Sequence, residues 1–340
     1  MTVRILEGDC RQVLRTLPDA SVHCCVTSPP YFGLRDYGVD GQMGLEASPD
    51  EFIAGMVEVF REVRRVLRDD GTLWLNIGDS YASTGGPGYQ GKTGQRADRR
   101  FTATRSSVAH RTASRRPPDD VKPKDMIGIP WMLAFALRAD GWYLRQDIIW
   151  SKPNPMPESV TDRCTKAHEY VFLLSKSDRY YYDFDAMQER VNGGAHARKA
   201  KSPAGWATGD TPHTPVAHQT AKAHRKVAEP GEKIKANSSF NAAVTDLVET
   251  RNKRSVWTIA SEPFKEAHFA TFPPALVEPC IKAGCPQGGV VLDPFFGAGT
   301  TGLVADRLQR NCIGIELNPA YAAIARQRIL GEAPLLTEVA

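Results

Sequence analysis

The feature that most constrains the fold is a glycine-rich loop near the end of the chain, between an apolar run and a helical pattern. Gly297, Gly299 and Gly302 follow "GGVVLD" and lead into "TTGLVADRL", with Thr300 inside the loop. Glycine has no side chain, so its backbone can come close to a bound cofactor. Glu316 ends the next strand-like run, where an acid accepts hydrogen bonds from ribose hydroxyls. The segment therefore predicts a strand, a cofactor loop and a helix in an α/β fold.

Strand-like and helix-like runs alternate over most of the 340 residues, which predicts an α/β fold with a mostly parallel sheet. Residues 45–67 carry apolar side chains at helical spacing, between the strand-like "VHCCVTS" and "TLWLNIG". Residues 83–124 and 187–254 are poor in core residues and rich in basic and small polar ones. We expect residues 83–124 to form a mobile insert. These changes in composition divide the chain into five segments: 1–82, 83–124, 125–186, 187–254 and 255–340.

Charge and cysteine usage exclude several classes of protein. The N-terminus is too charged for a signal peptide, and no apolar run reaches the ~20 residues that span a bilayer. We therefore expect no membrane association and a cytoplasmic location. The seven cysteines form no CxxC pair, so no metal site is expected and the thiols are interpreted as reduced.

Asp293 distinguishes between two cofactors that use such a glycine loop. It ends the strand before the glycines, where a dinucleotide places its diphosphate, and a carboxylate there repels phosphate. The same charge attracts a cation, such as the amino group of S-adenosylmethionine, whose sulfonium adds to the attraction. We therefore expect S-adenosylmethionine rather than a nicotinamide dinucleotide. The alternative roles are a helix N-cap for Asp293 and a solvated strand end for Glu316.

A second motif, Ser28-Pro29-Pro30-Tyr31, follows the strand-like "VHCCVT". Proline lacks a backbone N–H and fixes the chain, so the motif ends the strand and points a carbonyl group out of the hydrogen-bonded ladder. Without the glycine loop, the motif is equally consistent with a tight turn after an edge strand.

Taken together, "TSPPY" and "DPFFGAGTT" resemble the amino-directed DNA methyltransferases, which methylate cytosine N4 or adenine N6. The order, with the tetrad first and the cofactor loop last, resembles their permuted beta group, over nearly the whole chain except the two basic stretches. The resemblance implies a Rossmann-like S-adenosylmethionine-dependent methyltransferase fold in circularly permuted order, with basic inserts. It also implies that Asp9 contacts the cofactor's adenine amine, and that Phe272, Pro273 and Phe295 line its methionine pocket. Core packing is the alternative for both phenylalanines.

The tetrad suggests the chemistry. An exocyclic amine on an aromatic ring is a poor nucleophile, because its lone pair is delocalised into the ring. The Ser28 hydroxyl and the Pro29 carbonyl offer two acceptors for its N–H bonds, and Tyr31 offers a face for the extruded base. Serine at the first tetrad position resembles the cytosine-N4 enzymes, and aspartate the adenine-N6 enzymes. Cytosine N4 is therefore the expected target, without a covalent enzyme intermediate.

Double-stranded DNA is the expected partner, because a base must be flipped out of the duplex to reach such a site. Basic side chains supply phosphate contacts, and the stretch 187–254 stands where the family carries its target-recognition region. Its candidate DNA-binding residues are Lys199, Lys201, Lys222, Arg225 and Lys226. Arg35 either contacts DNA or forms a surface ion pair. A cognate restriction endonuclease and a homodimer are partners that the sequence leaves undecided.

Four other functions stay open at this point. The first is methylation of adenine N6 by the same fold. The second is methylation of a protein glutamine or of RNA, although such enzymes usually resemble an Asn-Pro-Pro-Tyr tetrad. A nicotinamide dehydrogenase is the third, and Asp293 and the tetrad disfavour it. The fourth is a DNA-binding module without catalysis, which should lack the intact cofactor loop that this chain has.

Overall fold

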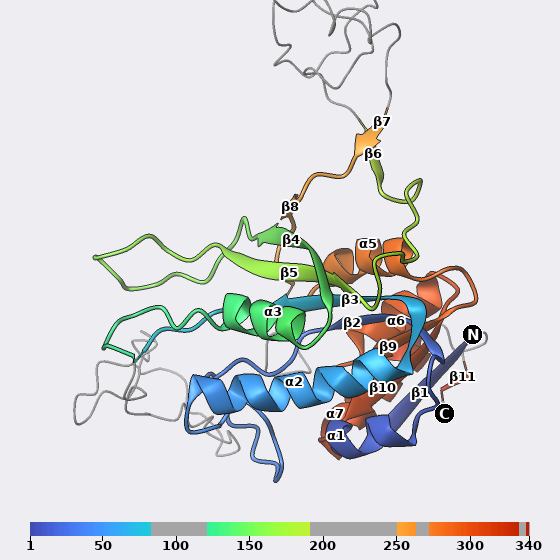
Figure 1. The fold of residues 1–340 in the computed structure, drawn as a ribbon, viewed down its shortest axis with the longest axis horizontal. Coiled ribbons are helices and arrows are strands. Elements are labelled where there is room, and N and C mark those ends of the chain that lie inside the picture. The colour runs from blue at the N-terminus through green and yellow to red at the C-terminus, as the bar shows by residue number, and fades with distance from the viewer. Residues whose placement is uncertain (83–120, 191–249, 263–271, 333–337, 340) are drawn as a thin grey trace, which may run out of the picture. The chain divides into compact units, whose positions relative to one another are not determined.

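The computed structural model describes residues 1–82, 121–190, 250–262, 272–332 and 338–339 (Figure 1). Within them, nine strands form one sheet in the order β11-β1-β10-β9-β2-β3-β5-β4-β8. The strands are β1 (Thr2–Glu7), β2 (Val22–Thr27), β3 (Leu67–Ile77), β4 (Tyr143–Ser151), β5 (His168–Ser175), β8 (Val256–Thr258), β9 (Val290–Asp293), β10 (Asn311–Glu316) and β11 (Glu338–Val339). The helices are α1 (Cys10–Val13), the short 3-10 helix η1 (Leu14–Thr16), α2 (Pro49–Val66), α3 (Ile129–Ala139), α5 (Pro274–Gly284), α6 (Thr300–Arg307) and α7 (Pro319–Glu332).

The sheet is mostly parallel, as the alternation of strands and helices predicted. Strand β5 is the exception, because it pairs antiparallel with both β3 and β4. The other pairs in the sheet are parallel, from β11 and β1 through β10, β9 and β2 to β3, and from β4 to β8. The carboxyl ends of β1, β10, β9, β2 and β3 therefore lie along one edge of the sheet, which is where open α/β sheets bind their ligands.

The chain divides into two compact units. The first comprises residues 1–183 and 255–340 and contains the sheet. The second comprises residues 184–254, in which β6 (Gln188–Arg190) pairs antiparallel with β7 (Thr250–Asn252). Most of the stretch 83–124 lies outside the described residues, and so do the basic residues predicted to contact DNA, which are Lys199, Lys201, Lys222, Arg225 and Lys226. None of the described helices is long and apolar enough to cross a membrane.

Helix α2 forms because its sequence combines a capped start with a continuous apolar stripe. The Ser48 side chain accepts a hydrogen bond from the Glu51 backbone N–H, and Pro49 occupies the first turn. Its buried residues recur at helical spacing and include Phe52, Met56, Val59, Phe60 and Val63. Strand β3 begins directly after the helix, earlier than the predicted stop at Asp-Asp-Gly. Val22 of β2 pairs with Leu67 and Cys24 pairs with Thr72, so the register shifts between these two pairs and the additional residues lie in β3.

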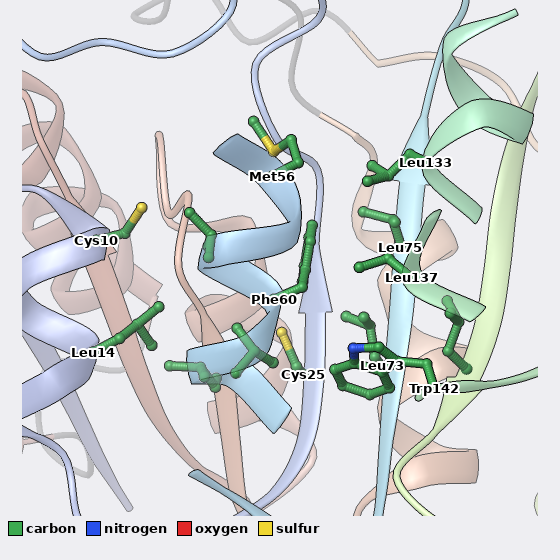
Figure 2. Close-up of a cluster of buried hydrophobic side chains, with 14 of the residues drawn as sticks. Cys10, Leu14, Cys25, Met56, Phe60, Leu73, Leu75, Leu133, Leu137 and Trp142 are labelled. Carbon is green, nitrogen blue, oxygen red and sulfur yellow. The ribbon is translucent and has the colours of Figure 1, made fainter. Parts of the chain in front are cut away.

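The two faces of the sheet carry different layers. Side chains alternate along a strand, so Leu73 and Leu75 of β3 face one way and Trp74 and Asn76 the other. Figure 2 shows Leu73 and Leu75 beside Leu133 and Leu137 of α3, in the main hydrophobic cluster of the protein. On the opposite face, Trp74 and Asn76 line a small cavity together with residues of α5. Figure 1 shows α2 and α3 on one side of the sheet and α5 and α6 on the other.

Candidate functional site

The two sequence motifs meet at the carboxyl edge of the sheet. The tetrad Ser28–Tyr31 follows β2, and the glycine loop follows β9. Strands β2 and β9 are direct neighbours, with Cys25 opposite Leu292. Asp9 follows β1 at the same edge, and Glu316 ends β10. The fold therefore brings together residues that the sequence separates by nearly the whole chain.

Asp293 connects the ends of β9 and β2. Its Oδ1 accepts hydrogen bonds from Thr27 Oγ1 at 2.6 Å and from the Phe295 backbone N–H at 3.1 Å. Its Oδ2 accepts from Thr301 Oγ1 at 2.7 Å. The residue is 0% exposed, and this burial raises the pKa of its carboxyl to about 6, against the hydrogen bonds. Its oxygens are thus occupied by groups of the protein, and its contact with a cationic cofactor stays a prediction.

Glu316 lies beneath the glycine loop and holds it. Its Oε2 accepts the Gly297 backbone N–H at 2.7 Å, and its Oε1 accepts the Asn318 N–H at 2.8 Å. A carboxylate has about four lone-pair sites, so it retains capacity to accept from ribose hydroxyls. The loop itself requires glycine. Gly297 and Gly299 have φ of 53° and 76°, and a Cβ on Gly299 would lie 2.9 Å from that of Ala325.

The last residue of the tetrad, Tyr31, is held in place by a hydrogen bond and by close packing. The Tyr31 hydroxyl donates to Glu169 Oε2 at 2.6 Å, and the ring packs so closely against Gly78 that a Cβ there would lie 2.6 Å from Tyr31 Cε2. Burial raises the pKa of Tyr31 far above its ordinary value, as does the Glu169 charge, while a side-chain hydrogen bond with Ser28 opposes the rise. Pro29 is buried, and Ser28 is only half-buried. The Ser28 side chain is therefore partly open to solvent beside a fixed tyrosine.

A family model described as DNA methylase matches residues 22–327, which include both motifs. The chain belongs to the DNA methylase family. The methylase is 45% identical over 328 residues to the type II methyltransferase M.Cfr9I of Citrobacter freundii, a match that covers 96% of this chain and 88% of the relative. The predicted amino-directed methyltransferase family, which methylates N4 or N6 and uses S-adenosylmethionine, is thereby confirmed.

Solved structures show the same fold. The PvuII DNA methyltransferase, named as cytosine-N4-specific, aligns with a TM-score of 0.59 at 17% identity, over 97% of this chain and 88% of its own. TTHA0409 of Thermus thermophilus, named as a DNA modification methylase and solved in complex with S-adenosyl-L-methionine, aligns with a TM-score of 0.54 at 24% identity, over 99% of each chain. The predicted α/β methyltransferase fold is confirmed by these neighbours.

The other predicted cofactor residues of the methylase lie around the same edge. Phe272 lines a cavity of about 10 Å³ together with Thr27 and Asn76, and Pro273 is the N-cap residue of α5. Phe295 is half-buried against the main hydrophobic cluster. The hydroxyl of the buried Thr300 accepts a hydrogen bond from Arg328 Nη1 at 2.9 Å, so its contacts lie within the protein.

Asp9 is the N-cap residue of α1 and pairs with Arg11. Its Oδ1 accepts the Arg11 backbone N–H at 2.9 Å, and Arg11 Nη2 lies 2.5 Å from its Oδ2. Burial acts to raise the pKa of Asp9, but Arg11 outweighs burial and holds it below its ordinary value. Arg11 Nη2 also donates to the Gly41 carbonyl at 3.0 Å. This contact fixes the segment that follows the tetrad next to the proposed adenine site.

The structure adds residues that the sequence analysis missed. Tyr37 and Tyr321 form an edge-to-face pair with ring centroids 6.4 Å apart, and burial raises the pKa of both, with a smaller contribution from the Glu316 charge. The charge of Arg35 acts in the opposite direction and opposes the rise in pKa of both phenols. The signal in the sequence was weak, because Tyr37 lies in a loop and Tyr321 in a helix far along the chain.

Proposed function

We propose that this methylase transfers a methyl group from S-adenosylmethionine to the exocyclic N4 of cytosine in duplex DNA. The observation that carries the proposal is the junction of β2 and β9. There, the Thr27–Asp293 hydrogen bond of 2.6 Å joins the strand before Ser28 to the strand before the glycine loop. A cofactor seated on the glycine loop would lie next to the tetrad. This proximity is what a direct methyl transfer requires.

The residues at the carboxyl edge fit S-adenosylmethionine. Glu316 would accept from the ribose hydroxyls, Asp9 would receive the adenine amine, and Gly297 and Gly299 allow close approach of the backbone. Phe272 and Phe295 would line the methionine part. The bound cofactor supplies an electrophilic methyl group on its sulfonium. The arrangement supports this assignment because the Glu316 carboxylate retains lone pairs beyond those used by Gly297 and Asn318.

Ser28, Pro29 and Tyr31 would handle the target amine. The Ser28 hydroxyl and the Pro29 carbonyl accept its two N–H bonds, which favours a pyramidal nitrogen with its lone pair directed at the methyl group. The Tyr31 ring, held by Glu169 and Gly78, offers a face on which the flipped base stacks. Ser28 is uncharged, so we infer that the product nitrogen releases its proton to water. The serine is the residue that favours cytosine N4 over adenine N6.

The order of the motifs supports assignment to the permuted beta group. The tetrad follows β2, and the cofactor loop follows β9 after the basic stretch 187–254, which we assign to target recognition. Its basic residues would bind phosphates, and Arg35, which follows the tetrad in the sequence, would contact the backbone of the flipped nucleotide. With DNA as its substrate, we place the protein in the cytoplasm. By the same resemblance, we propose a cognate restriction endonuclease and a second copy of this chain as protein partners.

Product analysis tests the proposal. The purified protein is incubated with duplex DNA of random sequence and labelled S-adenosylmethionine. The DNA is then digested to nucleosides, which are identified by their mass. We expect N4-methylcytosine. N6-methyladenine would replace the cytosine assignment while keeping the reaction class, and the absence of any methylated nucleoside would reject the proposed activity.

A further inference from the structure

Residues 152–167 form a loop that joins β4 to β5, and Figure 1 shows it projecting beyond the ends of the strands. Strand β5 is antiparallel to both β3 and β4, so β4 ends at the same edge of the sheet as β3. The loop closes at its base, where the Lys152 backbone N–H donates to the Ala167 carbonyl at 2.8 Å. The Lys152 side chain forms an ion pair with Glu169, whose Oε2 lies 2.6 Å from Tyr31 Oη. The loop therefore starts next to the tetrad.

Both arms of this loop are held by neighbouring segments. In the first arm, Asn154 Nδ2 donates to the Ser261 carbonyl at 3.1 Å, and Asn154 Oδ1 accepts the Ser261 backbone N–H at 3.0 Å. In the second arm, Lys166 Nζ donates to the Asp79 carbonyl at 3.0 Å. The residues between the two arms are thus positioned from both sides, which lowers the cost of ordering them when a partner binds.

Met156 lies between the two arms and is 82% exposed, more than any other large apolar side chain of the described residues. Pro155 and Pro157 flank it, and proline fixes one backbone dihedral, so the segment loses little conformational freedom on binding. Four residues of extended chain span at most about 14 Å, so the Cα of Met156 lies within that distance of the Cα of Lys152. An exposed apolar side chain is thereby held close to the place where Tyr31 would stack a flipped base.

The charges of the loop permit the approach of DNA, because its acidic residues, Glu158 and Asp162, both form ion pairs. Glu158 pairs with Arg163, whose guanidinium also lies over the Tyr81 ring, 3.9 Å from its centroid. Asp162 Oδ2 lies 2.8 Å from Lys124 Nζ. Since these basic partners neutralise the acids, the loop presents its apolar side chain without repelling the phosphates of a duplex.

We propose that Met156 enters the base stack of the target DNA and fills the space that the flipped base leaves. This inference rests on the proposed function, since it assumes that a base leaves the duplex to stack on Tyr31. Proteins that unstack a duplex insert apolar side chains, methionine among them, between neighbouring bases. The unbranched methionine side chain adapts its shape to the gap, and its contacts with the adjacent bases offset part of the cost of flipping.

The test compares the full-length wild type with Met156→Ala and with Leu330→Ala, on duplexes that carry the methylated sequence. Leu330→Ala is the matched control, because it also removes an exposed apolar side chain, 41% exposed, from α7. One duplex has a normal base pair at the target, and the other has an abasic nucleotide opposite the target base. We expect Met156→Ala to lower the single-turnover rate about 10-fold on the paired duplex, because flipping is no longer assisted. On the abasic duplex, where flipping costs less, its rate should lie within about twofold of the wild type.

A second measurement follows base flipping without methyl transfer. The fluorescent base 2-aminopurine at the target position should brighten when the wild type or Leu330→Ala binds the duplex, and much less with Met156→Ala. A wild-type rate and wild-type brightening for Met156→Ala would overturn the role of Met156, and so would an equal loss of rate on both duplexes or in Leu330→Ala. Brightening that depends on Met156, without any methylated nucleoside, would reject the proposed activity and keep the role of Met156.

Discussion

Thr27 Oγ1 and Asp293 Oδ1 lie 2.6 Å apart, although the two residues are 266 positions apart in the sequence. Thr27 is the last residue before the tetrad, and Asp293 the last residue before the proline that leads into the glycine loop. The two residues are almost fully buried, so their hydrogen bond is protected from water. The geometry between the amine acceptors and the cofactor loop therefore depends on an interior contact. A small change at either residue should affect both stability and methyl transfer.

The first prediction concerns the pH dependence of stability. The pKa of Asp293 is about 6 in the folded protein, against an ordinary value of 3.8. Between these values the folded state binds more protons than the unfolded state, so this group's contribution to stability is complete below its ordinary pKa and falls as pH rises through about 6. A difference of roughly two pKa units corresponds to about 3 kcal/mol. Urea unfolding from about pH 4 to 7 should show this fall in the wild type and not in Asp293→Asn. The same pH dependence in both proteins would contradict the prediction.

The second prediction concerns the cofactor. Glu316→Gln should weaken S-adenosylmethionine binding by about 10-fold, because a neutral amide accepts more weakly than a carboxylate from ribose hydroxyls. Glu7→Gln is the matched control, since Glu7 pairs with Glu316 in the β1–β10 register but forms its ion pair with Arg326 at the surface. Calorimetry should show the loss only in Glu316→Gln, and neither protein should bind NAD. Equal affinities of the two variants for S-adenosylmethionine would remove the role of Glu316.

The third prediction concerns Ser28. Ser28→Ala removes one acceptor for the target amine and leaves the fold intact, because the side chain is half-buried and Pro29 and Pro30 remain. The rate of methyl transfer should fall by about 10²-fold, the scale of one missing transition-state hydrogen bond. Binding of the cofactor and of DNA should persist within a few-fold. Full activity in the variant would mean that the tetrad is only a turn.

The fourth prediction concerns Gly78. A Cβ at this position would lie 2.6 Å from Tyr31 Cε2, so Gly78→Ala should displace the tyrosine ring and slow methyl transfer. Cofactor binding should change little, because the glycine loop follows another strand. Gly331→Ala is the control, since among the described residues no atom outside its own helical turn lies within 4 Å of the added carbon. A single-turnover assay of both variants decides the matter, and an unaffected Gly78→Ala rate would show that the position of the Tyr31 ring is unimportant.

The fifth prediction concerns DNA binding. Replacing Lys222, Arg225 and Lys226 by alanine should weaken binding and lower the slope of log affinity against log salt, by about one for each phosphate that the variant no longer neutralises. A control variant that replaces Arg15, Arg68 and Lys282 of the first unit removes the same charge. Filter binding over a range of salt concentrations compares the two. Equal slopes for both variants would contradict the assignment of 187–254 to target recognition.

The sequence by itself determined the local elements that carry the motifs. The glycine loop between β9 and α6 and the tetrad after β2 were predicted at their observed places, and the helical pattern over 45–67 contains α2, which begins only at Pro49. These features depend on interactions between residues close in sequence, such as glycine at positive φ, proline at the end of a strand and apolar side chains at helical spacing. Because these motifs can be recognised from residues close in sequence, they were sufficient to identify the family.

Only the tertiary structure decided how these elements support one another. The sequence places Asp293 at the end of a strand, but it does not show that Thr27 and Thr301 enclose its carboxylate. Nor does it show that β5 runs antiparallel and brings Glu169 to Tyr31. Such contacts depend on the order and register of strands far apart in the chain. A shift of one residue in register would turn these side chains to the other face of the sheet, so the three-dimensional pairing alone fixes them.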